Sequence, residues 1–399
     1  MYINSSYSKQ NSLKEILAIP LLIIWPFLSF LLALKNPLGK YNRIIFLIYF
    51  GLTGFIRKLL ETGDANAWTN TIIAFASYGK KGFIYFGDES LFNPGYFTFL
   101  YLLSYLKYTA IIWSFIFVLT GIALLYIFHL QFSELRLRSC RIRSKEELCL
   151  FVFFICFIPF TSFGVKFWVA LNIFLIGFYL YMNKSKARGL LILISSALFH
   201  FAFSYMIMLF VIYFFIEKKL YKRPLYLFLL ICISIPVSYY ILSYIASDYI
   251  EYRYEAYSSG SLVEQRALWI QFDRFFMASF SYVALVVLFV KRRFISTQSS
   301  RSTLLFLFVL SIGLIPLMST LDGLDRYSRV FSYMMLIFLL KLSIEKTNHI
   351  NSLFFLSLPV FSYHMLVNFF MRKGELDIDI FFRDISYFIS GNLMSTVIY

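Results

Sequence analysis

The segment LILISSALFHFAFSYMIMLFVIYFFI, residues 191–216, decides the fold class of this chain. It contains no charged residue and one histidine, His200, near its middle. Basic clusters flank it at residues 184–188 and 218–223. One helical crossing of a bilayer needs about 20 apolar residues, and basic residues mark cytoplasmic ends. We therefore predict that the chain crosses outward and returns within this segment, as a short hairpin with His200 near the outer turn.

The composition extends this prediction to the whole chain. Of 399 residues, 60% are hydrophobic, 21% aromatic and 15% charged. We predict an all-α polytopic integral membrane protein, a single transmembrane domain over residues 1–399 with about 11–12 helices whose outward-facing loops form a polar cavity. An amphipathic tail is expected at 374–399 and a surface piece at 95–106. The expected spans are 16–34, kept as an anchor, 44–56, 109–130, 148–163, 168–182, 189–200, 201–216, 225–247, 275–290, 304–320, 329–344 and 351–370.

Under this topology, basic and acidic residues are distributed unequally between the two sides of the membrane. The expected cytoplasmic segments hold 21 of the 37 Lys and Arg residues but only five of the 21 Asp and Glu residues. The remaining, outward segments therefore hold 16 basic and 16 acidic residues. The formal net charge of +16 therefore falls on one side, which is the positive-inside pattern. This explains the basic excess without nucleic acid as a partner and predicts a multi-pass membrane protein. The four cysteines lie in an inner loop or inside spans, so neither disulfides nor a structural zinc is expected.

Charged residues of both signs lie on the expected outward face, in loops at about 57–108, 248–272 and 321–329 and in a short link around 166. If 321–329 is helical, Asp322, Arg326 and Arg329 share one face at steps of four and three. Arginine suits bidentate phosphate binding. A solvated cap of paired charges is the alternative there, as is a snorkelling helix-end role for Lys166. The candidate substrate-binding or diphosphate-binding residues are Arg57, Lys166, Arg253, Arg266, Arg326 and Arg329.

Two residues are candidates for catalytic proton transfer. His200 qualifies because an imidazole in a membrane bundle is costly to place, although a backbone carbonyl could satisfy it. Asp64 follows Gly63 and is the second candidate, with helix capping as the alternative. His364, deep in the last expected span, offers a weaker form of the His200 argument. No D-x-D cluster occurs in the outward loops at 57–108, 248–272 and 321–329, so we expect no metal and no cofactor.

Several motifs resemble the bacterial polysaccharide polymerases of the Wzy and EpsG type. The likeness runs over most of the chain in order and spacing. One departure is Lys166, where an arginine is expected; lysine keeps the charge but loses the bidentate fork. The motifs are Arg57 followed by Gly63-Asp64, then Asn93-Pro94-Gly95-Tyr96, Gly164-Val165-Lys166-Phe167-Trp168-Val169-Ala170, Leu198-Phe199-His200-Phe201-Ala202-Phe203-Ser204, and Asp325-Arg326-Tyr327-Ser328-Arg329 followed by Phe331-Ser332-Tyr333.

The resemblance implies a glycosyltransferase that joins undecaprenyl-diphosphate-linked repeat units, for O-antigen, capsule or exopolysaccharide, outside the cytoplasmic membrane. It implies a lipid-linked donor and a lipid-linked acceptor as partners, and leaves open whether a chain-length regulator docks. Under it, Arg57, Lys166, Arg326 and Arg329 hold the diphosphate, while His200, Asp64 or an outward carboxylate is the base. Arg253 and Arg266 would grip the second substrate or the growing chain.

Three other functions remain open from the residues alone. A flippase or exporter of lipid-linked oligosaccharide would usually show two similar halves, and no convincing internal repeat occurs here. Another lipid-dependent sugar transferase, such as an O-antigen ligase, would use the same kind of cavity with a different acceptor. A membrane acyltransferase would want its catalytic residues on the inner face.

Overall fold

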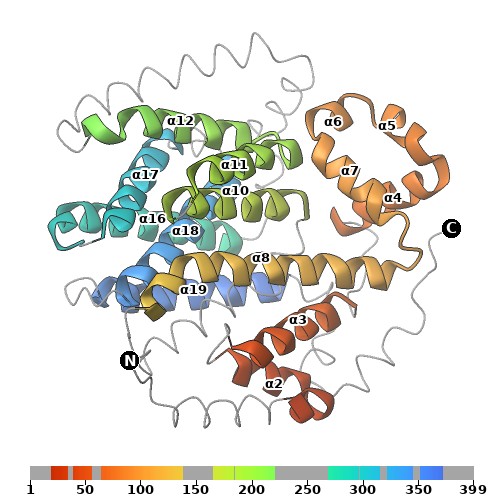
Figure 1. Ribbon diagram of the computed structural model, residues 1–399, viewed down its shortest axis with the longest axis horizontal. Helices are drawn as coiled ribbons and strands as arrows, with labels where there is room; N and C mark the ends of the chain where they lie inside the picture. The colour runs from red at the N-terminus through yellow and green to blue at the C-terminus, as the bar shows by residue number, and fades with distance from the viewer. Residues whose placement is uncertain are drawn as a thin grey trace. The chain divides into compact units, whose positions relative to one another are not determined.

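The computed structural model describes residues 19–34, 39–55, 64–137, 165–183, 185–220, 268–295, 297–314, 321–344 and 351–371. Within these ranges every regular element is helical and no strand occurs (Figure 1). The chain divides into two compact units, described separately below. Unit 1 takes residues 1–179, 198–201 and 368–399, and unit 2 takes residues 180–197 and 202–367.

Among the described residues, three helices have the length and apolar composition of membrane spans. They cover Thr109–Gln131, Val165–Asn183 and Leu268–Val290. Phe203–Phe215 and Gln298–Leu314 are shorter apolar helices. The expected all-helical, membrane-type architecture agrees with this, whereas the expected count of 11–12 spans stays a prediction. The expected spans 148–163 and 225–247, the tail 374–399 and all four cysteines lie outside the described residues.

Unit 1 is built on two helices that approach closely. α3 packs along α8, and a Cβ on Gly54 of α3 would collide with the carbonyl oxygen of Trp113 in α8. Gly121 of α8 similarly leaves room for Phe50. Small residues that let backbones approach are typical of helix packing in membranes. The helices of this part are α2 (Pro26–Ala33), α3 (Lys40–Phe55), α4 (Asp64–Tyr78), η1 (Gly79–Lys81), α5 (Gly82–Tyr85), α6 (Gly87–Phe92), α7 (Pro94–Leu103), α8 (Thr109–Leu137) and most of α10 (Val165–Asn183).

The segment between α3 and α8, expected as an outward loop, is largely helical. Gly79 and Gly87 adopt positive φ, at 54° and 49°, which ends α4 and separates α5 from α6. α7 then packs back against α4, and the buried Phe75 ring contacts those of Phe83, Phe86 and Phe97. This folded segment brings α6 and α7 to the residues of the site.

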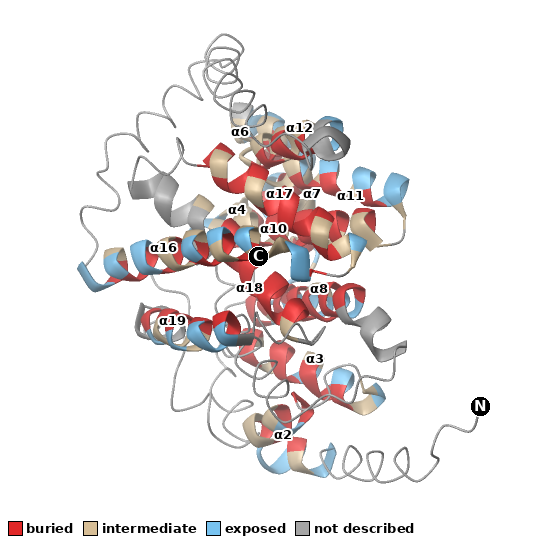
Figure 2. Cartoon of the chain, turned by 90° about the vertical axis from the view of Figure 1, so that its left-hand side faces the viewer, coloured by how far each residue is buried: buried red, intermediate tan, exposed pale blue. Residues whose placement is uncertain are grey.

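Unit 2 surrounds α18. Every side chain from residue 330 to residue 342 of this helix is buried, including those of Ser332 and Lys341 (Figure 2). Its packing neighbours are α16 and α17, and α17 also packs on α12. The elements are α11 (Lys186–Phe199, whose last two residues fall in unit 1), α12 (Phe203–Leu220), α16 (Leu268–Val290), η2 (Arg292–Phe294), α17 (Gln298–Leu314), α18 (Leu321–Ile344) and α19 (Asn351–Met371).

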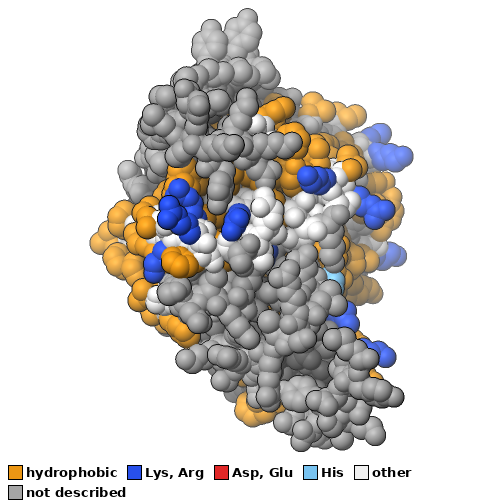
Figure 3. Space-filling view, turned by 60° about the vertical axis from the view of Figure 1, so that its left-hand side comes forward, with side chains coloured by type: hydrophobic (Ala, Val, Ile, Leu, Met, Phe, Trp, Pro, Cys, Tyr) orange, Lys and Arg blue, Asp and Glu red, His pale blue; other side chains and the backbone are white. Residues whose placement is uncertain are grey.

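The outer surface suits a lipid environment. α16 buries one side and exposes apolar side chains such as Phe272, Phe275 and Val286 on another. Hydrophobic side chains cover much of the coloured surface in Figure 3, with Lys and Arg side chains beside them. A solvated helix would not leave such residues exposed together.

The chain breaks at the histidine of the apolar segment, where a turn is predicted. α11 ends at Phe199, residues 200–202 form a turn, and α12 begins at Phe203. The predicted outward crossing and return stays a prediction. The segment 321–329 is helical and forms the first turns of α18, which meets the condition under which Asp322, Arg326 and Arg329 share one face.

Candidate functional site

Lys166 and Glu89 form an ion pair in unit 1. Lys166 lies in the first turn of α10, and its Nζ donates to Oε1 of Glu89 in α6 at 3.0 Å. The side chains are 17% and 36% exposed, so the pair stays in reach of solvent or ligand. A cation in the first turn of a helix opposes the helix dipole, and a neighbouring anion relieves this cost.

An aromatic ring also contacts this charge. Lys166 Nζ lies 5.3 Å from the ring centroid of Tyr96, within cation–π range. The ring of Tyr96 is buried and packs edge-on to Trp68 of α4 at 6.2 Å. The lysine is thus held between a carboxylate and an aromatic face.

Asn93 ties the hairpin turn to the corner between α6 and α7. It is 2% exposed; its Oδ1 accepts from the backbone N–H of Phe201 at 3.0 Å, and its Nδ2 donates to the carbonyl oxygen of Glu89 at 3.2 Å. Gly95 allows the approach, since a Cβ there would lie 3.1 Å from Leu198. A buried side-chain amide with both ends bonded fixes the local geometry firmly.

His200 lies in that turn and faces the start of α10. Its ring is edge-on to the ring of Phe167, with centroids 6.0 Å apart, and it is half-buried. Phe167 directly follows Lys166 in the sequence. We call Glu89, Asn93, Tyr96, Lys166 and His200 the Lys166 cluster.

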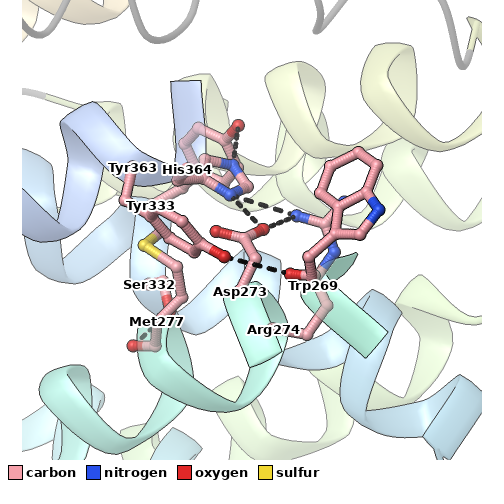
Figure 4. A network of polar contacts seen from close by, with 8 residues as sticks. All are labelled: Trp269, Asp273, Arg274, Met277, Ser332, Tyr333, Tyr363 and His364. Carbon is pink, nitrogen blue, oxygen red and sulfur yellow. Dashed lines mark hydrogen bonds and ion pairs between the residues drawn. The ribbon is translucent and has the colours of Figure 1, made fainter. Parts of the chain in front are cut away.

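A second polar group lies in unit 2, where three helices meet (Figure 4). Oδ2 of Asp273 lies 2.7 Å from Nη1 of Arg274 and 2.8 Å from Nδ1 of His364. Nε2 of His364 lies 3.4 Å from the hydroxyl of Tyr333. These four residues, from α16, α18 and α19, are the Asp273 network.

The residues of the Asp273 network are more deeply buried than the Lys166–Glu89 ion pair. Asp273 is 0% exposed, Arg274 3%, His364 2% and Tyr333 2%. Ionisable residues within membrane spans are rare because they are expensive, and they are usually functional.

A comparison with protein families bears on these two groups. The family model described as EpsG family matches residues 42–381, a range that contains both the Lys166 cluster and the Asp273 network. The chain belongs to the EpsG family. This is a family of Wzy-like polymerases, a polymerase type of enzyme. No curated protein and no solved structure matches the chain.

The EpsG motifs in the first half of the chain meet in unit 1. The segments around Asn93, Lys166 and His200 are far apart in sequence and lie together in the Lys166 cluster. Asp64 is the first residue of α4, and nothing further is described of its side chain. Arg57, Arg253 and Arg266 lie outside the described residues.

The late arginines of this EpsG family member belong to unit 2. Arg326 lies in the early turns of α18, where its side chain is not described. Arg329 is half-buried and lies one turn before Tyr333 on α18. Arg329 therefore lies on the same helix face as the Tyr333 side of the Asp273 network.

Sequence reasoning missed Glu89 as a partner of Lys166 and missed Asp273 and Arg274 altogether. The expected span began at 275, which left Asp273 and Arg274 just outside it, whereas α16 begins at Leu268. A charged pair inside an otherwise apolar run from 268 to 290 was the signal that could have found them. Glu89 carried no such signal, because only the fold brings it to Lys166.

Proposed function

We propose that this EpsG family member is a polysaccharide polymerase, a glycosyltransferase that joins undecaprenyl-diphosphate-linked oligosaccharide repeats on the outer side of the cytoplasmic membrane. The observation that supports it best is the Lys166 cluster. In it, a partly exposed cation, a carboxylate and a histidine come from three separate segments. The family match supplies the polymerase class.

The proposed step is a displacement at a sugar carbon. A hydroxyl oxygen of the acceptor bonds to the anomeric carbon of the donor repeat, and the bond from that carbon to the diphosphate oxygen breaks. Undecaprenyl diphosphate leaves with the electron pair, and the hydroxyl proton passes to a base. Such a step needs cations where the leaving diphosphate gains charge and a base near the hydroxyl.

Lys166 is the described cation of unit 1 that we assign to a diphosphate; Arg326 and Arg329 are the candidates within unit 2, and Arg57 is assigned from the sequence alone. Lys166 would act as a point charge, because a lysine lacks the bidentate fork of arginine. A diphosphate that binds it must compete with Glu89, which holds Nζ at 3.0 Å in the ligand-free chain. Arg253 and Arg266 are assigned to the acceptor or the growing chain.

The base is proposed to be His200, with Asp64 as the alternative. The ring of His200 is edge-on to the ring of Phe167 in the first turn of α10, and Phe167 directly follows Lys166 in the sequence. Glu89 is a third candidate base, because its carboxylate becomes available when a diphosphate draws Lys166 away from it. Each of the three needs hydrogen-bond reach to the acceptor hydroxyl.

The banding pattern of surface polysaccharide in a strain that lacks this gene tests the proposal. Loss of the long-chain ladder, with single repeat units still displayed, would support a polymerase, because export still works. Loss of all surface repeats, with lipid-linked repeats trapped inside, would indicate a flippase and overturn the proposal. An intact ladder would overturn it as well.

Complementation then tests the site. We expect Lys166→Ala and His200→Ala to fail to restore the ladder, whereas Lys81→Ala restores it. Lys81 is a matched control, because it is an exposed lysine of the same unit that lies outside the Lys166 cluster. A full ladder from both Lys166→Ala and His200→Ala would contradict the assigned roles.

A further inference from the structure

The Asp273 network is a costly way to fill the interior of unit 2. Asp273 and Arg274 are 0% and 3% exposed, and a charged group taken out of water needs compensation from its partners. Apolar side chains of similar size would fill such a site at least as stably. A role beyond stability therefore explains this network better than stability alone does.

The side chains of the network meet at one carboxylate oxygen. Oδ2 of Asp273 accepts from Nη1 of Arg274 at 2.7 Å, so the two charges compensate each other. Nδ1 of His364 lies 2.8 Å from that oxygen and 3.1 Å from Nη1 of Arg274. Nε2, on the other side of the ring, lies 3.4 Å from the hydroxyl of Tyr333. The imidazole thus links the buried ion pair to Tyr333.

The network holds one face of α18. Tyr333 contacts α19 through His364. The neighbouring Ser332 contacts α16, because its hydroxyl accepts from Ser281 at 2.9 Å and donates to the carbonyl oxygen of Met277 at 3.3 Å. Two adjacent residues thus bind α18 to two different helices, which restricts its rotation about its own axis.

Arg329 lies on the face that is fixed in this way. It precedes Tyr333 by four residues, so the two side chains lie one above the other on the helix. Unlike Tyr333, which is 2% exposed, Arg329 is only half-buried. It is therefore next to Tyr333 on the helix face that the network fixes. Any rotation of α18 would move this guanidinium.

We propose that Asp273, Arg274 and His364 are positioning residues that act through Tyr333 to fix the rotation of α18 and so aim Arg329 at the substrate diphosphate. This inference rests on the proposed function, because it takes Arg329 as a diphosphate ligand. A ligand misplaced by about 1 Å can cost roughly 100-fold in rate. The network therefore matters for rate although it does not touch substrate.

The test is a kinetic double-mutant cycle on the full chain, purified and reconstituted in lipid nanodiscs with a lipid-linked repeat unit as substrate. The variants are Tyr333→Phe, Arg329→Ala and the two combined, each checked for folding by thermal melting. Tyr282→Phe is the matched control, since it removes another tyrosine hydroxyl of unit 2, a half-buried one that donates to the carbonyl oxygen of Ser311 at 2.7 Å. His364→Gln is added because it keeps a polar atom near the position of Nε2.

We expect Tyr333→Phe to lower kcat/KM for the donor by roughly 10-fold or more, with Tyr282→Phe close to wild type and His364→Gln more active than His364→Leu. In the Arg329→Ala background, Tyr333→Phe should cause no further loss, since the residue it positions is gone. Additive losses from chains that melt like wild type would overturn the inference while leaving the proposed function intact. A wild-type chain that makes no polymer would overturn both.

Discussion

The Lys166 cluster and the Asp273 network use similar residue types in opposite surroundings. In the cluster, the side chains of Lys166 and Glu89 are 17% and 36% exposed. In the network, those of Arg274 and Asp273 are 4% and 0% exposed. A partly exposed pair can exchange its partner for a ligand at little cost, but a buried pair cannot lose either member without leaving a charge in the interior. The difference indicates a ligand-binding role for Lys166 and a supporting role for Asp273.

The largest expected effect is on stability, at the buried pair. Asp273→Leu leaves the guanidinium of Arg274 without its carboxylate and should destabilise the chain by about 3–5 kcal/mol. Thermal melting of the purified chain, followed by size exclusion of the fraction that stays folded, measures this loss. The double variant Asp273→Leu with Arg274→Met should recover much of it, because no buried charge is left. An Asp273→Leu chain that melts like wild type would show that the pair is not buried as described.

The next effect concerns Asn93, a neutral buried residue of the Lys166 cluster. Asn93→Ala leaves the N–H of Phe201 unsatisfied and should cost about 1–3 kcal/mol. It should also lower polymer yield, since the turn that holds His200 loses its link to α7. Asn70→Ala, an exposed position on α4, serves as control. Equal melting temperatures for the two variants would contradict the importance of this link.

Lys166 should show the reverse pattern, with little change in stability and a large change in function. Lys166→Ala should alter the free energy of unfolding by less than about 1 kcal/mol. Loss of one group that stabilises transition-state charge should lower polymerisation by roughly 100-fold. Lys166→Arg should retain activity, because arginine supplies both the charge and a bidentate fork. Melting curves and polymer yield, measured on the same preparations, separate the two effects. An unstable Lys166→Ala chain would contradict this prediction, because Lys166 would then stabilise the fold as the buried pair of the Asp273 network does.

The smallest expected effect is at Glu89. Glu89→Gln removes the competitor for Lys166 and should lower the donor KM several-fold, while stability changes by less than about 1 kcal/mol. Initial rates at varied donor concentration measure this. A collapse of kcat with KM unchanged would contradict the role of competitor and would instead identify Glu89 as the base.

The sequence was sufficient for features that depend on local pattern. The apolar segment around His200 was too long for one span and flanked by basic residues, which predicts a turn at the histidine, and α11 and α12 are separated there. The four-residue and three-residue steps among Asp322, Arg326 and Arg329 were compatible with a helix, and α18 includes them. Both are properties of a continuous stretch of chain.

Features that depend on tertiary packing could not be read in this way. Glu89 and Lys166 are 77 residues apart, and Asp273 and His364 are 91 apart. Nothing in either local sequence specifies the partner, because the pairing follows from how α6 packs near α10 and how α16 and α19 meet α18. His364 had been noticed for its depth in a span, but the carboxylate that orients it lay outside the expected boundary of α16.

Reconstitution tests the central claim most directly. The purified chain would be placed in nanodiscs with undecaprenyl-diphosphate-linked repeat units as the sole substrate, and both glycan length and released undecaprenyl diphosphate would be measured. We expect a ladder of glycans spaced by one repeat unit, with one undecaprenyl diphosphate released for each repeat added. A folded chain that binds the lipid-linked repeat but releases no undecaprenyl diphosphate and extends no glycan would contradict the account.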